Sequence, residues 1–259
     1  MNIFVFDIET VPDTNSGRLL YQLESASDKE VAETMVKKRQ EKTGSTSTFL
    51  PHHLQRIVAI SGVLRSRDQF KIASFGDVNS SEEHLIESFF KCLEKYLPIL
   101  VSWNGSGFDL PVLHYRALLH GISSPSYWNH GDDGDASFRW NNYLSRYHYR
   151  HSDLMDILAG YQSRSNAPLT EIALMLGLPG KLGMDGSQVW DYFLEGKRQA
   201  IRDYCETDVL NTYLIYLRFE LIRGKLTPEA YRKECDYARE CIIQEKKPHF
   251  EEFVKTWKK

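Results

Sequence analysis

The sequence predicts one α/β domain with a mixed β-sheet, and three observations support this class. Apolar and β-branched residues fill both faces of residues 3–8, as in a strand buried inside a sheet. Two strand-like runs, residues 55–65 and 69–76, are separated by a few polar residues, a spacing that suits an antiparallel hairpin. Helical and strand-like periodicity alternate after this hairpin, and no linker divides the chain.

The other elements of the first half follow from periodicity and from end signals. Polar and charged residues predict a surface helix at about residues 28–40, with a loop after it. Apolar spacing predicts a helix at residues 81–96, and a short strand follows at residues 99–103. The glycine-containing turn at residues 104–107 leads into a helix at about residues 110–120.

The second half begins with an insertion at residues 122–152, which is too aromatic to be a linker. Residues 154–158 are either a short strand or the start of a helix, and a short helix is expected at residues 170–176. A long amphipathic helix is expected at about residues 197–222. Residues 227–229, Thr-Pro-Glu, then supply an N-cap, a first-turn proline and a first-turn acid, which open a C-terminal helix.

Length and composition set the limits of this interpretation. A chain of 259 residues with 42% apolar and 26% charged side chains is typical of a globular protein with a sizeable core. We expect a main domain at residues 1–222 and a helical extension at residues 223–259 that packs on it. Lys and Arg number 32 and Asp and Glu 35, which gives a net charge of −3. This balance excludes a strongly basic protein that coats duplex nucleic acid, and it permits contacts to a few phosphates.

Cysteine usage and hydropathy predict a cytoplasmic protein. The four cysteines form neither a C-x-x-C pair nor a Cys/His zinc pattern, so reduced thiols are expected. No apolar run approaches the ~18 residues of a membrane span, and the N-terminus lacks the basic region of a signal peptide.

Two acids lie at the end of the first predicted strand. Asp7 and Glu9 are two residues apart, so a strand would point both carboxylates to the same face. Acids at the end of a buried strand are costly unless a cation or hydrogen-bond donors satisfy them. The same D-x-E spacing at Asp28 and Glu30 lies in a charged helix and is expected to face water. For Asp7 and Glu9 alone, a cation site and a solvent-facing strand end are equally supported.

Two further candidates come later in the chain. Asp109 follows a strand and a turn, so it is either an acid at a helix N-terminus or part of a site at the strand end, where Asn104 could donate and accept hydrogen bonds. Tyr204 and Asp208 lie four residues apart and share one face of the long helix. Their spacing also occurs at Tyr149 and Asp153, but the helix at residues 197–222 has an apolar stripe that places Asp208 at its margin.

Three motifs, in this order, carry a resemblance to a known family. They are Phe6-Asp7-Ile8-Glu9-Thr10, Asn104-x3-Phe108-Asp109 and Tyr204-x3-Asp208. The series resembles the exonuclease motifs of the DnaQ-like superfamily of 3′–5′ exonucleases, in the DEDDy form. It is most similar to the proofreading exonuclease domain of family-B DNA polymerases. More closely still, it resembles the stand-alone bacterial proteins described as predicted 3′–5′ exonucleases related to that domain. The resemblance covers about residues 1–222.

The resemblance implies a fold, an activity and a metal site. The fold would be ribonuclease H-like, with a mixed five-stranded sheet flanked by helices, and no polymerase domain would be present. The cofactors would be two divalent cations, Mg²⁺ or Mn²⁺, which prefer carboxylate oxygens. One cation would be held by Asp7, Glu9 and Asp208. The other would be held by Asp7 and the substrate phosphate, with Asp109 in contact through water. Tyr204 would orient the attacking water, and the products would be nucleoside 5′-monophosphates.

The substrate implied by the resemblance is the 3′ end of a single strand, with DNA preferred over RNA. Phe108 and the backbone at Thr10 and Val11 would lie near the terminal nucleotide, and Asn104 is assigned to the same binding set. No motif announces a contact to a 2′-hydroxyl, the group that distinguishes RNA from DNA. An exoribonuclease is therefore an alternative.

The aromatic insertion offers a second candidate surface for a single strand. Its rings are interleaved with Arg139, Arg146 and Arg150, a combination that holds single strands without sequence readout. Each ring by itself is expected to pack in a small aromatic core, whereas the arginines together are expected to contact nucleic acid. By contrast, Lys37-Lys38-Arg39 is expected to be a solvated helix face.

Two other interpretations compete with this one. A ribonuclease H-like module that binds nucleic acid without cutting it would be marked by a lost carboxylate, but all four are present. The histidine variant of the superfamily is marked by H-x4-D, which His148–Asp153 and His151–Asp156 both match. We prefer Tyr204 and Asp208, because the histidine pairs lack the long helix that packs on a core.

Overall fold

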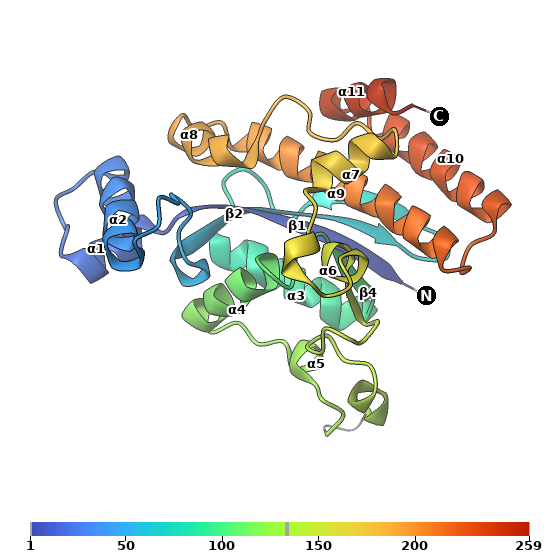
Figure 1. The fold of residues 1–259 in the computed structure, drawn as a ribbon, viewed down its shortest axis with the longest axis horizontal. Helices are drawn as coiled ribbons and strands as arrows, with labels where there is room; N and C mark the ends of the chain where they lie inside the picture. The colour runs from blue at the N-terminus through green and yellow to red at the C-terminus, as the bar shows by residue number, and fades with distance from the viewer. Residues whose placement is uncertain (1, 133–134, 259) are drawn as a thin grey trace.

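A mixed five-stranded sheet in the order β3-β2-β1-β4-β5 forms the centre of the protein (Figure 1). The computed structural model describes residues 2–132 and 135–258. The strands are β1 (Ile3–Pro12), β2 (Gln55–Arg65), β3 (Phe70–Ser74), β4 (Ile99–Ser102) and β5 (His151–Asp153). β1 pairs antiparallel with β2 and parallel with β4, so the predicted mixed sheet is confirmed.

Helices cover both faces of this sheet. In chain order they are α1 (Thr14–Tyr21), α2 (Asp28–Thr43), α3 (Glu82–Tyr96), α4 (Asp109–His120), α5 (Pro125–Trp128), α6 (Leu154–Leu158), α7 (Leu169–Met175), α8 (Val189–Leu194), α9 (Arg198–Ile222), α10 (Pro228–Gln244) and α11 (Pro248–Thr256). Single 3-10 turns are η1 (His52–Leu54), η2 (Ala136–Arg139), η3 (Ser163–Ser165) and η4 (Gly186–Gln188). None of the helices in the described ranges combines the length and the apolar character of a membrane span.

Side chains of β1 point alternately to the two faces of the sheet, so successive residues contact different helices. Phe4, Phe6 and Ile8 pack in one core with α3 and α4, whereas Val5 packs in the opposite core with α9. Figure 1 shows α3 and α4 on one side of the sheet and α9, α10 and α11 on the other. Odd-numbered residues of β1 therefore face α9, and this layer is where Asp7 and Glu9 point.

Most predicted elements are confirmed, and the differences fall on short or tertiary-dependent segments. The hairpin strands, α3, α4 and α9 lie within a few residues of their predicted bounds. The segment at residues 154–158, whose sequence allows a strand or a helix, is the helix α6. The end of the predicted insertion overlaps β5, a three-residue strand that pairs only with β4 and is too short to give a periodic signal. Neither α1 nor α8 was predicted, because each is a short element.

The C-terminal extension contains two helices, where the sequence predicted one. Glu206 of α9 connects them to the sheet. Its carboxylate accepts hydrogen bonds from the Ser74 backbone N–H at 2.9 Å, from Lys247 Nζ at 2.9 Å and from His249 Nε2 at 2.8 Å. Burial alone would raise the pKa of Glu206, but the His249 and Lys247 bonds hold it at about 2. A fully partnered buried acid thus fixes α11 to α9 and β3.

A second buried ion network ties α4 to β2 and α1. The Arg116 guanidinium pairs with both Asp13 and Glu82, and all three side chains are buried. Glu82 also accepts the Ile57 backbone N–H at 2.7 Å and bonds His120 Nε2 at 2.9 Å. Removal of the arginine would leave two buried carboxylates without their main counter-charge.

We therefore expect Arg116→Ala to lower the free energy of unfolding by about 3–5 kcal/mol, the cost of stranding buried charge. Urea denaturation of the purified variant measures this loss. The control is Arg146→Ala, which removes a surface ion pair with Asp156 whose arginine side chain is 47% exposed. That change should cost less than about 1 kcal/mol. Equal effects of the two variants would contradict the assigned role of Arg116.

Candidate active site

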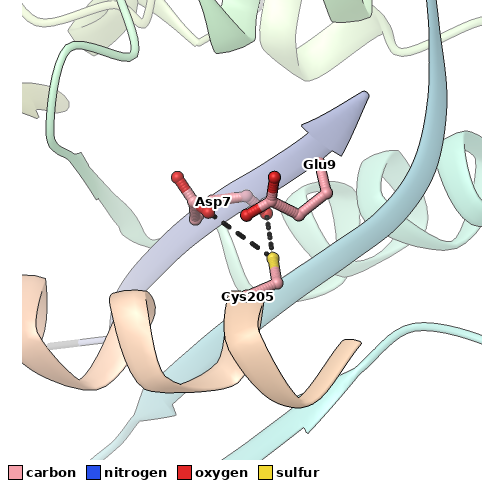
Figure 2. A group of neighbouring side chains, drawn as sticks. All are labelled: Asp7, Glu9 and Cys205. Atoms are coloured by element: carbon pink, nitrogen blue, oxygen red, sulfur yellow. Dashed lines mark hydrogen bonds between the residues drawn. The ribbon is translucent and has the colours of Figure 1, made fainter. Parts of the chain in front are cut away.

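The first two carboxylates lie on the α9 side of β1. Ligand atoms of Asp7, Glu9 and Cys205 all fall within 4.8 Å of one another, and no other group in the described ranges combines residues of β1 and α9 in this way (Figure 2). The Cys205 thiol contacts Asp7 Oδ2 at 3.5 Å and the Asp7 carbonyl oxygen at 3.4 Å. A register shift between Glu9 and Thr10 interrupts the pairing with β2 directly after these acids, and the pairing resumes at Thr10.

Asp109 reaches the same part of β1, at Ile8, from the first turn of α4. Its Oδ1 accepts the Ile8 backbone N–H at 3.1 Å. That N–H is available because β4 pairs with β1 only through Ile3, Phe4 and Val5. Asp109 therefore takes the place of a missing strand partner. The bond holds its carboxylate at Ile8, the residue between Asp7 and Glu9.

Another acid binds the backbone of the turn that precedes α4. Asp153, at the end of β5, accepts the backbone N–H groups of Asn104 and Ser106, both at 2.9 Å. Asn104 has φ of 65°, and a Cβ at Gly105 would collide with the Ser102 side chain. These constraints fix the path of the chain into Asp109, so Asp153 positions the turn and lies outside the carboxylate group of β1.

Tyr204 and Asp208 lie on α9, and the charge of Asp208 raises the pKa of both Asp7 and Glu9. Both side chains are buried, and Asp208 Oδ1 has no hydrogen-bond partner among the described residues. A buried carboxylate oxygen without a donor is costly, which marks this atom as one that needs a cation or a proton. Burial raises the pKa of Tyr204 far above its usual range, and the charge of Asp208 raises it further, so the hydroxyl keeps its proton.

Burial and mutual repulsion dominate the electrostatics of the four acids. Burial raises the pKa of Asp7 well above its usual range, and the charges of Asp109 and Asp208 add to the rise. The pKa of Glu9 is raised in the same way, by burial and then by Asp7 and Asp208. Burial also brings the pKa of Asp109 to about 7 and that of Asp208 to about 6. The cluster therefore strongly favours a positive partner.

The residues expected to bind substrate are divided between two places. Thr10 and Phe108 line a groove of about 790 Å³ that starts at Glu9. Val11 is buried, so only its backbone could contact a ligand. Asn104 lines a separate cavity of about 480 Å³ on the other side of the turn. The structure thus brings Thr10 and Phe108 to the carboxylates and does not bring the Asn104 side chain there.

The aromatic insertion is divided between a small core and an exposed surface. Tyr127, Phe138 and Tyr143 are buried together, so the expectation that single rings pack in a core is confirmed for these three. It is wrong for the exposed rings, which are those of Trp128, Trp140, Tyr147 and Tyr149. That its arginines together contact nucleic acid stays a prediction, although two of the three already have partners within the protein. Arg150 lies over the Phe138 ring at 4.1 Å, and Arg146 pairs with Asp156 at 2.6 Å.

The competing motif pairs lie away from the acids of β1. Tyr149 is exposed, and its ring lies under the Arg223 guanidinium at 4.7 Å. His151 is buried in β5, where its Nε2 bonds the Ser102 hydroxyl at 2.9 Å, and burial lowers its pKa to about 4. By contrast, the charges of Asp109 and Asp208 raise the pKa of both Asp7 and Glu9.

One residue near the acids, Lys181 in the loop between α7 and η4, was not predicted from the sequence. Against the dominant effect of burial, its ammonium lowers the pKa of both Glu9 and Asp208. It also pairs with Asp185 at 2.5 Å. Flanking glycines at 180 and 183 mark a loop in the sequence, but only the fold shows that this loop returns to the acids.

The strand order, with two acids inside the central strand β1, is that of a ribonuclease H-like fold. The chain belongs to the family described as predicted 3′-5′ exonucleases related to the exonuclease domain of PolB, whose sequence pattern matches residues 47–257. The match includes Asp109, Tyr204 and Asp208, as well as α10 and α11. Asp7 and Glu9 precede it.

The chain is also similar to a part of each of two DNA polymerases. The chain is 28% identical over 164 residues to a DNA polymerase of Archaeoglobus fulgidus, a match that covers 61% of this chain and 19% of that protein. It is 25% identical over 146 residues to the catalytic subunit of DNA polymerase epsilon from Saccharomyces cerevisiae, a match that covers 54% of this chain and 6% of that protein. The similarity thus spans a small part of each polymerase.

The raised pKa of Asp208 gives a pH dependence with a defined sign. Its folded-state pKa of about 6 exceeds the ordinary value of 3.8, so the native state binds this proton more tightly than the unfolded state. This contribution to stability is complete below about pH 4 and is lost as the pH rises through 6. In chelator, the stability of the parent should therefore fall relative to that of Asp208→Asn between pH 4 and 7, by up to about 3 kcal/mol.

Denaturant titrations of both proteins across this pH range measure the difference. A divalent cation added at pH 7 should stabilise the parent more than the Asn variant, because binding to the native state adds to its stability. Stability curves that stay parallel from pH 4 to 7 would show that Asp208 is not held in a repulsive, buried environment.

Proposed function

We propose that this protein is a divalent-cation-dependent 3′–5′ exonuclease that shortens single-stranded nucleic acid, DNA in the first place, and releases nucleoside 5′-monophosphates. One observation carries the proposal: carboxylates from β1, α4 and α9 converge, and Asp208 Oδ1 is buried there without a partner among the described residues. Membership in a family of predicted 3′-5′ exonucleases supports the same reaction. We further propose that the protein acts in the cytoplasm.

The donor set fits hard divalent cations. Asp7, Glu9 and Asp208 offer oxygen ligands, as Mg²⁺ and Mn²⁺ prefer. The Cys205 thiol is not a competing ligand, because burial and the charge of Asp7 raise its pKa well above the usual range. We assign Asp7, Glu9 and Asp208 as the direct ligands and Asp109 as a contact through water.

Each residue of the site then has a separate task. Bound cations supply the charge that activates water and stabilises the leaving 3′ oxygen. Tyr204 keeps its proton, so its hydroxyl orients the attacking water as a donor and does not act as a base. Phe108 and the backbone of Thr10 border the terminal nucleotide at the mouth of the groove. Lys181, beside Glu9 and Asp208, adds positive charge where phosphate charge develops.

Digestion of 5′-labelled oligonucleotides tests the activity, its polarity and its metal. With Mg²⁺ or Mn²⁺, DNA carrying an unpaired 3′ end should be shortened one nucleotide at a time, and a blunt duplex should be a poorer substrate. Excess chelator should stop the reaction. Asp208→Ala should abolish it without unfolding the protein, because loss of one repelling acid opens no core cavity, whereas Asp236→Ala, an exposed acid of α10, should leave it intact.

The same digestion assay with RNA oligonucleotides and with circular DNA completes this test. Faster digestion of RNA would assign the exoribonuclease alternative, and nicking of circles would refute an exonuclease. Retention of single-strand binding with no cleavage in any metal would assign the inactive binding module.

Tyr204→Phe isolates the hydroxyl from the ring. The ring and its packing remain, so strand affinity should be nearly unchanged, whereas kcat should fall by about tenfold to a hundredfold because the water loses its orientation. Tyr149→Phe is the matched control, because that side chain is exposed on the insertion. Single-turnover rates and binding in chelator separate the two effects. A Tyr204→Phe variant that turns over like the parent would remove Tyr204 from the mechanism.

A further inference from the structure

The groove that begins at Glu9 continues between two helices far apart in the sequence. One wall is α2, and the other is formed by η4 and α8. Figure 1 shows α2 and α8 at the same end of the sheet. The volume of about 790 Å³ exceeds what one metal cluster needs and lies within the range of sites that enclose an extended ligand. No sequence motif predicts a ligand-binding role for either wall.

The α2 wall carries two lysines on the groove side. Lys29 and Lys37 line the groove and are exposed, and no ion pair in the described ranges includes either of them. Lys38, the next residue, does not line the groove and pairs with Glu41 at 3.4 Å. The expectation of a solvated helix face therefore fits both lysines, and Lys37 in addition lines the groove that Glu9 also lines.

Aromatic rings lie on both sides of the same path. Phe49 is 51% exposed and packs against Phe108 with ring centroids 5.4 Å apart. On the opposite wall, Trp190 stacks on Phe193 with centroids 5.8 Å apart and planes within 14°. Flat rings combined with lysines form the arrangement by which proteins hold single strands without sequence readout.

We propose that α2 and α8 form the two walls of a channel for the single strand that precedes the cleaved 3′ nucleotide. Lys29 and Lys37 contact its phosphates, and Phe49 and Trp190 stack on its bases. This assignment rests on the proposed function, because the occupant is chosen by continuity with Glu9 and by the phosphate-binding charge of the lysines. Both α1 and α2 precede the residues that the family pattern matches, so the wall is an addition to the matched region.

The distance between the two lysines can be compared with the length of one nucleotide step. Eight residues of helix separate Lys29 from Lys37 by about 12 Å, more than one nucleotide step of a strand, so they contact different phosphates. Glu33 lies between them on the groove side and is exposed. An acid in this position repels the strand and limits its affinity. Neutral replacement of either lysine should therefore weaken strand binding, whereas neutral replacement of Glu33 should strengthen it.

Equilibrium binding of a fluorescent single-stranded oligonucleotide, measured by anisotropy in chelator at several salt concentrations, tests the channel. Lys29→Gln and Lys37→Gln should each weaken binding several-fold and lower the slope of log Kd against log salt by about 0.7, the loss of one phosphate contact. Glu33→Gln should tighten binding. Lys38→Gln is the matched control and should bind like the parent. Trp190→Leu should weaken binding by about fivefold or more with no change in slope.

The outcomes separate this proposal from the proposed function. If the parent digests 3′ ends but both lysine variants keep the parental slope, or if Lys38→Gln weakens binding as much as Lys37→Gln, the channel assignment is overturned and the exonuclease stands. If the slopes shift as expected while the parent never cleaves with any metal, the channel stands as a strand-binding surface and the exonuclease assignment falls.

Discussion

Asp7 and Glu9 bring two carboxyl groups into the interior at the point where β1 has run past its parallel neighbour β4, and Asp109 and Asp208 add two more acids around them. Like charges buried together destabilise a fold unless a cation or protons balance them. Three features of the fold bring these acids together. The side-chain alternation of β1 points Asp7 and Glu9 toward α9, and the Ile8 N–H binds Asp109. The apolar stripe of α9 packs on the sheet and places Asp208 opposite β1.

Comparison with the other buried acids shows why this cluster is different. Glu82 is neutralised internally by Arg116, and Glu206 by Lys247 and His249. Beside Glu9 and Asp208, Lys181 lowers the pKa of both acids, but its ammonium also pairs with Asp185. Glu82 and Glu206 thus have resident counter-charges, whereas Asp208 keeps a buried oxygen without a hydrogen-bond partner among the described residues.

Local signals predicted the elements, and tertiary placement explains what they could not predict. The apolar run of β1, the caps of α3 and the stripe of α9 are local, so α3 and α9 were predicted to within a residue or two. The start of β1 was predicted as well, but the strand runs to Pro12, past its predicted end at residue 8, so Asp7 and Glu9 lie inside it. The four acids were identified by their order in the family motifs. β5 exists only through its pairing with β4, and Lys181 reaches the acids only through the return of its loop. Asp153 matched a catalytic spacing by chance and instead supports a turn. The groove depends on α2 and α8, which no sequence spacing relates.

The contact between the Cys205 thiol and Asp7 joins residues 198 positions apart, one near the start of the sequence and one in the last third. During synthesis, β1 leaves the ribosome long before α9 exists. The two halves of the candidate site therefore meet only after most of the chain has been translated and α9 has docked on the sheet. Such long-range contacts form late in folding, since chain entropy must first be overcome. A nascent chain that lacks α9 would carry the acids of β1 without their partners, so the proposed nuclease activity would require that α9 has docked.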